Sequence, residues 1–156
     1  MPKFTNLKDL EAYLQRNFHE VMNSSMELER VMAEEMSRAV VDVVYSAYDP
    51  KDYERRGNND GLSDPRNGIV SDVIIEDNGK VRLIFENITE GNDSLQGDLL
   101  VDTIEEGIWD NWWSPASPYA DARTFMQETA NRIKQNPEDV IAAIEKGLSS
   151  KGFVVR

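Results

Sequence analysis

A helical stripe of apolar residues that ends at a proline sets the strongest limit on how this chain can fold. From Leu28 to Ala47 an apolar residue recurs every three or four positions, which is the period of one face of an α-helix. Pro50 cannot continue a helix, and it pushes Asp49 toward an extended conformation. The sequence therefore predicts a long helix that stops near residue 48 and gives way to a different kind of structure.

The residues before this stripe are predicted to be helical as well. Thr5 or Asn6 can cap a first helix, because apolar residues follow it at helical spacing. The run from Ser24 to Glu27 has the form of a capping box, a serine three residues before a glutamate. It either starts a second helix or lies inside one long helix. Both alternatives make residues 1–48 helical.

We name the next segment, residues 45–64, the joint. It is crowded with Tyr, Arg, Asn, Gly and Asp, which hydrogen-bond and turn more than they fill a core. Gly57 and Gly61, with the Asn and Asp between them, supply turn chemistry that includes positive φ. From composition alone the joint is either a plain helix-to-strand loop or a surface for another protein.

A small antiparallel sheet is predicted after the joint. Residues 70–76 and 80–87 alternate or run apolar as strands do, and Asp77-Asn78-Gly79 between them is a strong hairpin signal. In the second strand one face is mostly polar. Residues 99–108 are expected to supply a further strand.

All three tryptophans follow directly, at positions 109, 112 and 113. They can cover one edge of the core, with their ring nitrogens hydrogen-bonded. They can also form an exposed anchor for another protein, because Trp is enriched in binding hot spots. The sequence leaves both interpretations open for Trp109, Trp112 and Trp113.

The C-terminal part is predicted to be a linker followed by helices. Asn136-Pro137-Glu138-Asp139 has the order of a helix start, with a cap, a first-turn proline and acids at the positive end of the dipole. The predicted fold is α+β in a single domain, 1–156. It consists of 1–48 helical, 49–113 as turn-rich joint and small sheet, and 114–156 as linker and C-terminal helices.

Composition argues against several classes of partner. The formal net charge of −12 disfavours nucleic acid and anionic membranes, since both require a basic footprint. No apolar run has membrane-spanning length and no signal-peptide pattern is present. The chain has no Cys, so disulfides and thiolate metal sites are excluded.

No catalytic or metal-binding motif emerges from the residues. The single histidine, His19, has no neighbours at ligand spacing. The run Asn58-x-Asp60-Gly61 resembles part of a calcium loop, but the twelfth position would be Asn67 where an acid is required. We therefore expect no enzyme activity, no cofactor and no metal.

The order of features resembles the head–tail joining, or tail-completion, proteins of the neck of long-tailed bacteriophages and prophages. Like them, the chain runs from a long helix into a Tyr- and Arg-rich segment and then through a leucine into its sheet. Further similar pieces are a strand ending in a Glu-x-Gly type turn and an Arg-x-Phe opening of a C-terminal helix. The segments that carry the resemblance are Val43–Arg56, Gly61–Asp64, Leu99–Ile108 and Arg123–Met126.

The resemblance implies a virion structural protein that joins the head, at its portal or connector, to the tail without catalysis. It implies phage connector or adaptor proteins and tail-terminator or tail-tube proteins as partners, a homo-oligomeric ring, and a location in the virion, with assembly in the host cytoplasm. A ring needs heterologous contacts, and we expect the joint to supply one patch. Its residues would be Tyr48, Tyr53, Arg55 and Arg56, unless the two arginines only pair with surface acids.

Two other classes remain open on the sequence. One is an acidic host-interaction or inhibitor protein that mimics nucleic acid and binds a basic partner, which would require one-sided rows of carboxylates. The other is a small hydrolase or metal enzyme, which would require a deep pocket with perturbed acids. These features distinguish the alternatives once the surface is known.

Overall fold

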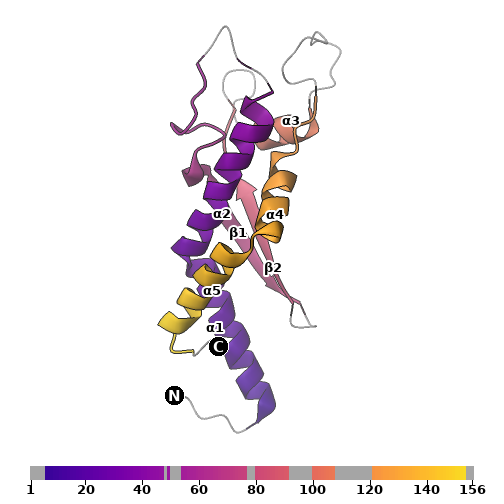
Figure 1. The fold of residues 1–156 in the computed structure, drawn as a ribbon. Helices are drawn as coiled ribbons and strands as arrows, with labels where there is room; N and C mark the ends of the chain where they lie inside the picture. Colours follow the sequence, from indigo (N-terminus) through magenta and orange to yellow (C-terminus); the bar gives the residue numbers. More distant parts are fainter. Residues whose placement is uncertain are drawn as a thin grey trace.

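The computed structural model describes residues 6–47, 49, 54–76, 80–91, 100–107 and 121–153. Its fold is α+β, with helices at both ends of the chain and an antiparallel pair of strands between them. The molecule is elongated, because two N-terminal helices follow one another along its length and the C-terminal helices lie beside them (Figure 1). The predicted fold class is confirmed.

The N-terminal helical region is two helices, as one of the two alternatives expected. α1 (Leu7–Ser24) is capped by the side chain of Asn6, and α2 (Met26–Ala39) by the hydroxyl of Ser25. The second cap lies one residue after the serine of the predicted capping box. The backbone of Ser25, with φ −82° and ψ 87°, ends α1 and allows α2 to start in a new direction.

α2 continues into a wider turn, η1 (Val40–Tyr45), which is a π-helix. Its hydrogen bonds reach five residues back, as from Ser46 N to Val41 O at 3.0 Å. The turn keeps Val44 buried while Val41 is 48% exposed. The apolar stripe is thus confirmed as far as Val44, but the helix ends at Tyr45 and Ala47 is exposed.

A short 3-10 turn, η2 (Pro65–Asn67), leads from the joint into the sheet. β1 (Gly68–Ile75) pairs with β2 (Val81–Asn87) in antiparallel register, with a bulge at Ser71. The two predicted strands are confirmed within two residues of the expected ends. The predicted turn, residues 77–79, lies outside the described residues.

The sheet has one apolar and one polar face. Arg82 and Glu86 are exposed on the outward face, as the alternation in the sequence predicted. The inward face packs on the helices α1, α2 and α5 through a core that includes Met22, Leu28 and Met32. The inward side chains are Val70, Val73, Val81, Leu83 and Phe85.

The predicted further strand at residues 99–108 is wrong, because its described part is a helix, α3 (Leu100–Glu106). The apolar residues Leu100, Val101 and Ile104 are spaced for one face of a helix, and all three pack on the same core. In a strand, Leu100, Asp102 and Ile104 would share one face, which would bury the acid with its apolar neighbours. Helical spacing buries the apolar side chains and leaves Asp102 at the surface.

α3 also contributes an acceptor to the next helix. Glu105 accepts a hydrogen bond from Met126 N at 2.6 Å, near the start of α4 (Phe125–Gln135). Burial raises the pKa of the Glu105 carboxyl, and the bond from Met126 offsets only part of that shift. The folded state therefore holds the proton of this carboxyl more tightly than the unfolded state does. Stability from this group is present below its usual pKa of about 4.3 and is lost as the pH rises through the folded pKa.

Glu105→Gln is accordingly expected to raise the melting temperature near pH 7 by about 1–3 °C, with a smaller gain near pH 4. The amide oxygen can still accept from Met126 N, while the cost of a partly buried charge is removed. Thermal unfolding followed by circular dichroism at both pH values measures this, with Glu106→Gln at the exposed neighbouring position as control. A lower melting temperature at pH 7 would contradict the assignment.

The two C-terminal helices are confirmed. In α4 the side chain of Phe125 is 0% exposed and joins the core of α2 and α3. α5 (Glu138–Ser150) starts one residue later than predicted, because Asn136 ends α4 and Pro137 takes the cap position. Gly152, with φ +86°, terminates α5. No helix among the described residues is long and apolar enough to cross a membrane.

Candidate functional site

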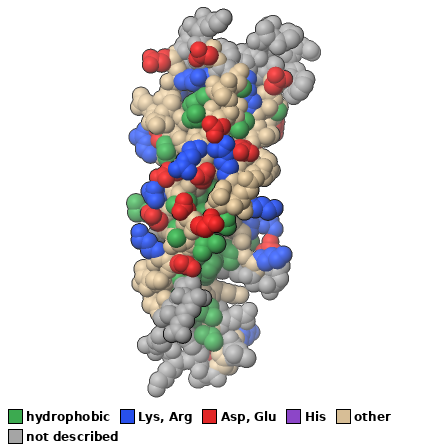
Figure 2. Space-filling model, in the orientation of Figure 1, with side chains coloured by type: hydrophobic (Ala, Val, Ile, Leu, Met, Phe, Trp, Pro, Cys, Tyr) green, Lys and Arg blue, Asp and Glu red, His purple; other side chains and the backbone are tan. Residues whose placement is uncertain are grey.

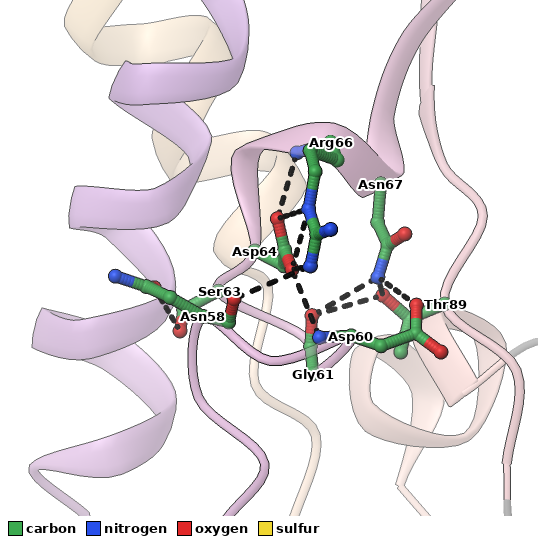
Figure 3. Close-up of polar contacts among 8 residues, drawn as sticks. All are labelled: Asn58, Asp60, Gly61, Ser63, Asp64, Arg66, Asn67 and Thr89. Carbon is green, nitrogen blue, oxygen red and sulfur yellow. Dashed lines mark hydrogen bonds and ion pairs between the residues drawn. The ribbon is translucent and has the colours of Figure 1, made fainter.

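A buried carboxylate holds the second half of the joint in place. Asp64 is 2% exposed and accepts hydrogen bonds from Arg66 Nε (3.0 Å), Arg66 N (3.0 Å) and Asp60 N (2.8 Å) (Figure 3). Its bond to the Arg66 guanidinium holds the pKa of Asp64 well below the usual range. A buried charge with this many donors fixes the turn between joint and sheet.

Buried amides tie the same turn to the end of β2, which pairs with the start of β1. Asn67 Nδ2 donates to Gly61 O at 3.2 Å and to Thr89 Oγ1 at 3.1 Å (Figure 3). Asn87 Nδ2 donates to Leu62 O at 2.9 Å, and its Oδ1 accepts from Thr89 N at 2.9 Å. The joint, the start of β1 and the end of β2 therefore form one hydrogen-bonded unit, which we name the hub (Asn58, Asp60, Gly61, Leu62, Ser63, Asp64, Arg66, Asn67, Asn87 and Thr89).

The hub is also attached to the end of η1. Ser63 N donates to Tyr45 Oη at 3.3 Å. The Arg55 guanidinium lies 4.7 Å from the centroid of the Tyr45 ring, and the same side chain donates to Tyr45 O at 3.2 Å. Arg56 donates to Glu90 O at 2.7 Å, just beyond the sheet. These contacts bind the long helix, the joint and the strand ends together.

The predicted site residues thus fall into two groups. Arg55 and Arg56 are described, and both side chains have partners within their own chain, Tyr45 and Glu90 respectively. The assignment of these arginines to a partner surface stays a prediction. The remaining predicted site residues, Tyr48, Tyr53, Trp109, Trp112 and Trp113, lie outside the described residues.

The polar side chains of the hub bond mainly to other groups of the hub. Every buried side-chain nitrogen or oxygen atom among the described residues has a hydrogen-bond partner. Within the same residues no group of three or more His, Asp or Glu side chains is placed to hold a metal ion. The sequence does carry one signal for the hub, because Asp64 before Pro65 is the pattern of a cap followed by a first-turn proline.

A charged groove of ≈ 220 Å³ lies between α2 and α5. Sequence reasoning missed it, because the two charged helix faces that form it are about a hundred residues apart in the chain. Figure 2 shows acidic and basic side chains interleaved on this side of the molecule, where Arg30 pairs with Glu27 and Glu34. The lining residues are Glu27, Arg30, Val31, Glu34, Glu35, Arg38, Asp139, Ala142, Ala143 and Lys146.

Comparison with known proteins gives the chain a family. It is similar to the SPbeta prophage-derived uncharacterized protein YomN of Bacillus subtilis (strain 168), with 28% identity over 151 residues, which cover 94% of this chain and 95% of that protein. No solved structure matches the chain. The model of the YomN family matches residues 6–150, which include every described helix and strand. The chain therefore belongs to the YomN family.

Proposed function

We propose that this protein is a structural component of a phage particle that joins the head to the tail by protein–protein assembly and without catalysis. The observation that carries the proposal is the similarity to a prophage-derived protein over 94% of this chain and 95% of the other. A match of this extent relates the whole domain, and not one shared module, to a phage gene product. The order of helix, joint and sheet supports the finer assignment to the neck.

The hub supports an assembly role on physical grounds. A subunit that connects two larger bodies by surface contact must hold its contact surfaces in a fixed geometry. Asp64, Asn67 and Asn87 are each at most 8% exposed, and their hydrogen bonds join three separate segments. The joint is thereby presented on a rigid base, which suits a contact surface better than a free loop would.

Within this proposal Arg55 and Arg56 have two tasks. The side chain of Arg55 is 25% exposed, so most of it packs within the chain and positions the joint. The exposed remainder, with Arg56, Tyr48 and Tyr53, forms the proposed partner patch. Arg and Tyr suit such a patch because both bring large contact area and hydrogen-bond donors.

The proposed partners are the connector or adaptor proteins on the head side and the tail-terminator or tail-tube proteins on the tail side. The protein acts there as a homo-oligomeric ring in the virion, after assembly in the host cytoplasm. Direct binding of nucleic acid or of membranes is not part of the proposal, since the net charge of −12 opposes both.

Deletion of the gene from a phage that carries it tests the function. We expect electron microscopy to show DNA-filled heads and complete tails that are not joined, and wild-type protein to restore joined particles. Arg55→Ala with Arg56→Ala should fail to restore them while circular dichroism shows a folded protein. Arg16→Ala with Arg38→Ala, at two exposed helix positions, is the matched control and should restore joining. Normal particles in the deletion strain would refute the proposal.

The acidic-mimic alternative is less well supported. It requires rows of carboxylates on one side of the molecule that are not interrupted by bases. The face in Figure 2 instead carries Lys and Arg between its acids. Along α2, Arg30 and Arg38 each pair with glutamates of the same helix. A face of this kind gives a basic partner less attraction than an unbroken row of carboxylates would.

A further inference from the structure

The outer edge of β2 offers unpaired backbone groups. In the antiparallel register, Glu76 N bonds to Lys80 O at one end of the pair and Ile88 N to Asn67 O at the other. Backbone groups alternate between the two sides of a strand, so those of residues 82, 84 and 86 face β1. Those of Leu83 and Phe85 face away from it, and no described residue outside the sheet bonds to them.

The opposite edge of the sheet is already occupied. On β1 the backbone groups that face outward include those of Val70 and Val73. Val70 N donates to the carboxylate of Glu29 on α2 at 3.0 Å, and Val73 N to the carboxylate of Asp72 at 2.7 Å. Among the described residues, these outward N–H groups of β1 already have acceptors, whereas those of Leu83 and Phe85 on β2 do not. An additional strand is therefore expected to join at β2.

The side chains of β2 are complementary to a second copy of themselves. Arg82 and Glu86 lie two residues to either side of Ile84. If two β2 strands pair antiparallel about a twofold axis at Ile84, Arg82 of each copy faces Glu86 of the other. In the same register Leu83 faces Phe85 of the second copy, and these are the residues whose backbone groups point across the edge.

The side chains of Arg82 and Glu86 are free to form ion pairs with a second copy. Both side chains are exposed on the outward face, and Glu86 has no ion-pair partner among the described residues. Arg82 pairs with Glu76 at 2.5 Å but remains 65% exposed, and its guanidinium has donors for a second carboxylate. Ile84 of the two copies would meet on that face, next to Ile74, which is 38% exposed.

We infer that the free protein forms a twofold dimer in which β2 pairs with β2 of a second copy, giving a continuous four-stranded sheet. A two-stranded sheet is marginal by itself, and added strands stabilise it. Charges on an edge strand can also serve only to prevent pairing. The symmetric placement of opposite signs about Ile84 favours pairing, because like charges at 82 and 86 would repel in this register. The inference is independent of the proposed role at the neck, which needs a different, heterologous contact.

Charge reversal tests the pairing on the full chain at physiological ionic strength, where repulsion between the two acidic bodies is screened. Analytical ultracentrifugation should give a wild-type mass of twice 17.8 kDa. Glu86→Arg places arginines opposite each other, leaves Arg82 and Glu76 intact, and should raise the dissociation constant about tenfold. Arg82→Glu places two glutamates opposite each other and should raise the dissociation constant by a similar factor.

Two restorations make the test specific. The double variant Arg82→Glu with Glu86→Arg keeps opposite signs in the same register and should dimerise like the wild type. A mixture of the two single variants should form a heterodimer, because one copy then carries two acids and the other two bases. In both cases circular dichroism serves to check that the variants are folded.

Amide hydrogen exchange locates the contact. The amides of Leu83 and Phe85 should exchange quickly in dilute protein and become protected as the concentration rises. A monomer at every concentration up to the millimolar range overturns the inference. So does an oligomer whose mass is unchanged in both single variants, or protection that leaves these two amides exposed.

Discussion

Gly61→Ala is expected to lower the free energy of unfolding by about 3 kcal/mol, because a side chain at this buried position would collide with the backbone of its own turn. A β-carbon there would lie 2.5 Å from Gly57 O, 2.6 Å from Gly57 N and 3.0 Å from Arg56 C. All three are backbone atoms, so the clash cannot be relieved by turning a side chain. The loop would have to move, and Gly61 O would lose its bonds from Asn67 and Thr89.

Gly57→Ala is the matched control for this prediction. Gly57 lies in the same turn with φ +54°, and a β-carbon there would meet nothing within 4 Å. Gly57→Ala should lower the free energy of unfolding only by the strain of an alanine in a left-handed conformation, about 1–2 kcal/mol. Urea unfolding of the two variants measures the difference. If Gly61→Ala costs no more than Gly57→Ala, the close packing of the hub is disproved.

Asp64→Asn is expected to cost about 2–3 kcal/mol near pH 7. The side chain keeps its size, but the amide nitrogen replaces an acceptor that faces the donors of Asp60 and Arg66. Asp42→Asn is the control, because its carboxylate is 60% exposed and pairs with Arg132 at the surface. Exposed pairs of this kind contribute about 0–1 kcal/mol.

The same substitution has a defined pH dependence. The pKa of Asp64 is lowered by its bond to Arg66, so its contribution to stability is complete above the unfolded pKa of about 3.9. It is lost as the pH falls from there toward the folded pKa. The difference in unfolding free energy between wild type and Asp64→Asn should therefore be constant from about pH 5 to 7 and shrink in acid. A difference that grows in acid would show that the carboxylate is not stabilised by these donors.

The elements predicted correctly are those whose signals are local. The stripe from Leu28 to Val44 and the alternation in β2 each repeat over a short stretch, and burial of one face follows directly from them. The same approach failed at residues 100–106, where three apolar residues are too few for period alone to separate strand from helix. In the folded chain the helical spacing buries Ile104 in the same core cluster as Phe125 and Met36.

The hub could not be predicted because its bonds join residues far apart in the chain. Asn87 bonds to Leu62 and Asn67 to Thr89, and neither pair has a sequence signal linking its members. The residue type of Arg55 allows its role in the joint to be predicted. Its contact with the Tyr45 ring cannot be predicted in this way, because it depends on the π-helical end of the long helix. The apolar period gives no sign of that end. The tryptophan interpretation stays open, since those residues lie outside the described part of the chain.

We propose that this domain is an assembled part of a phage particle, positioned between head and tail. Cryo-electron microscopy of purified, intact particles of the phage tests it most directly. We predict a ring of density between portal and tail into which α1, α2 and the β1–β2 sheet fit as a repeated unit. Particles whose neck is fully accounted for by other proteins, with this chain absent, would contradict the account.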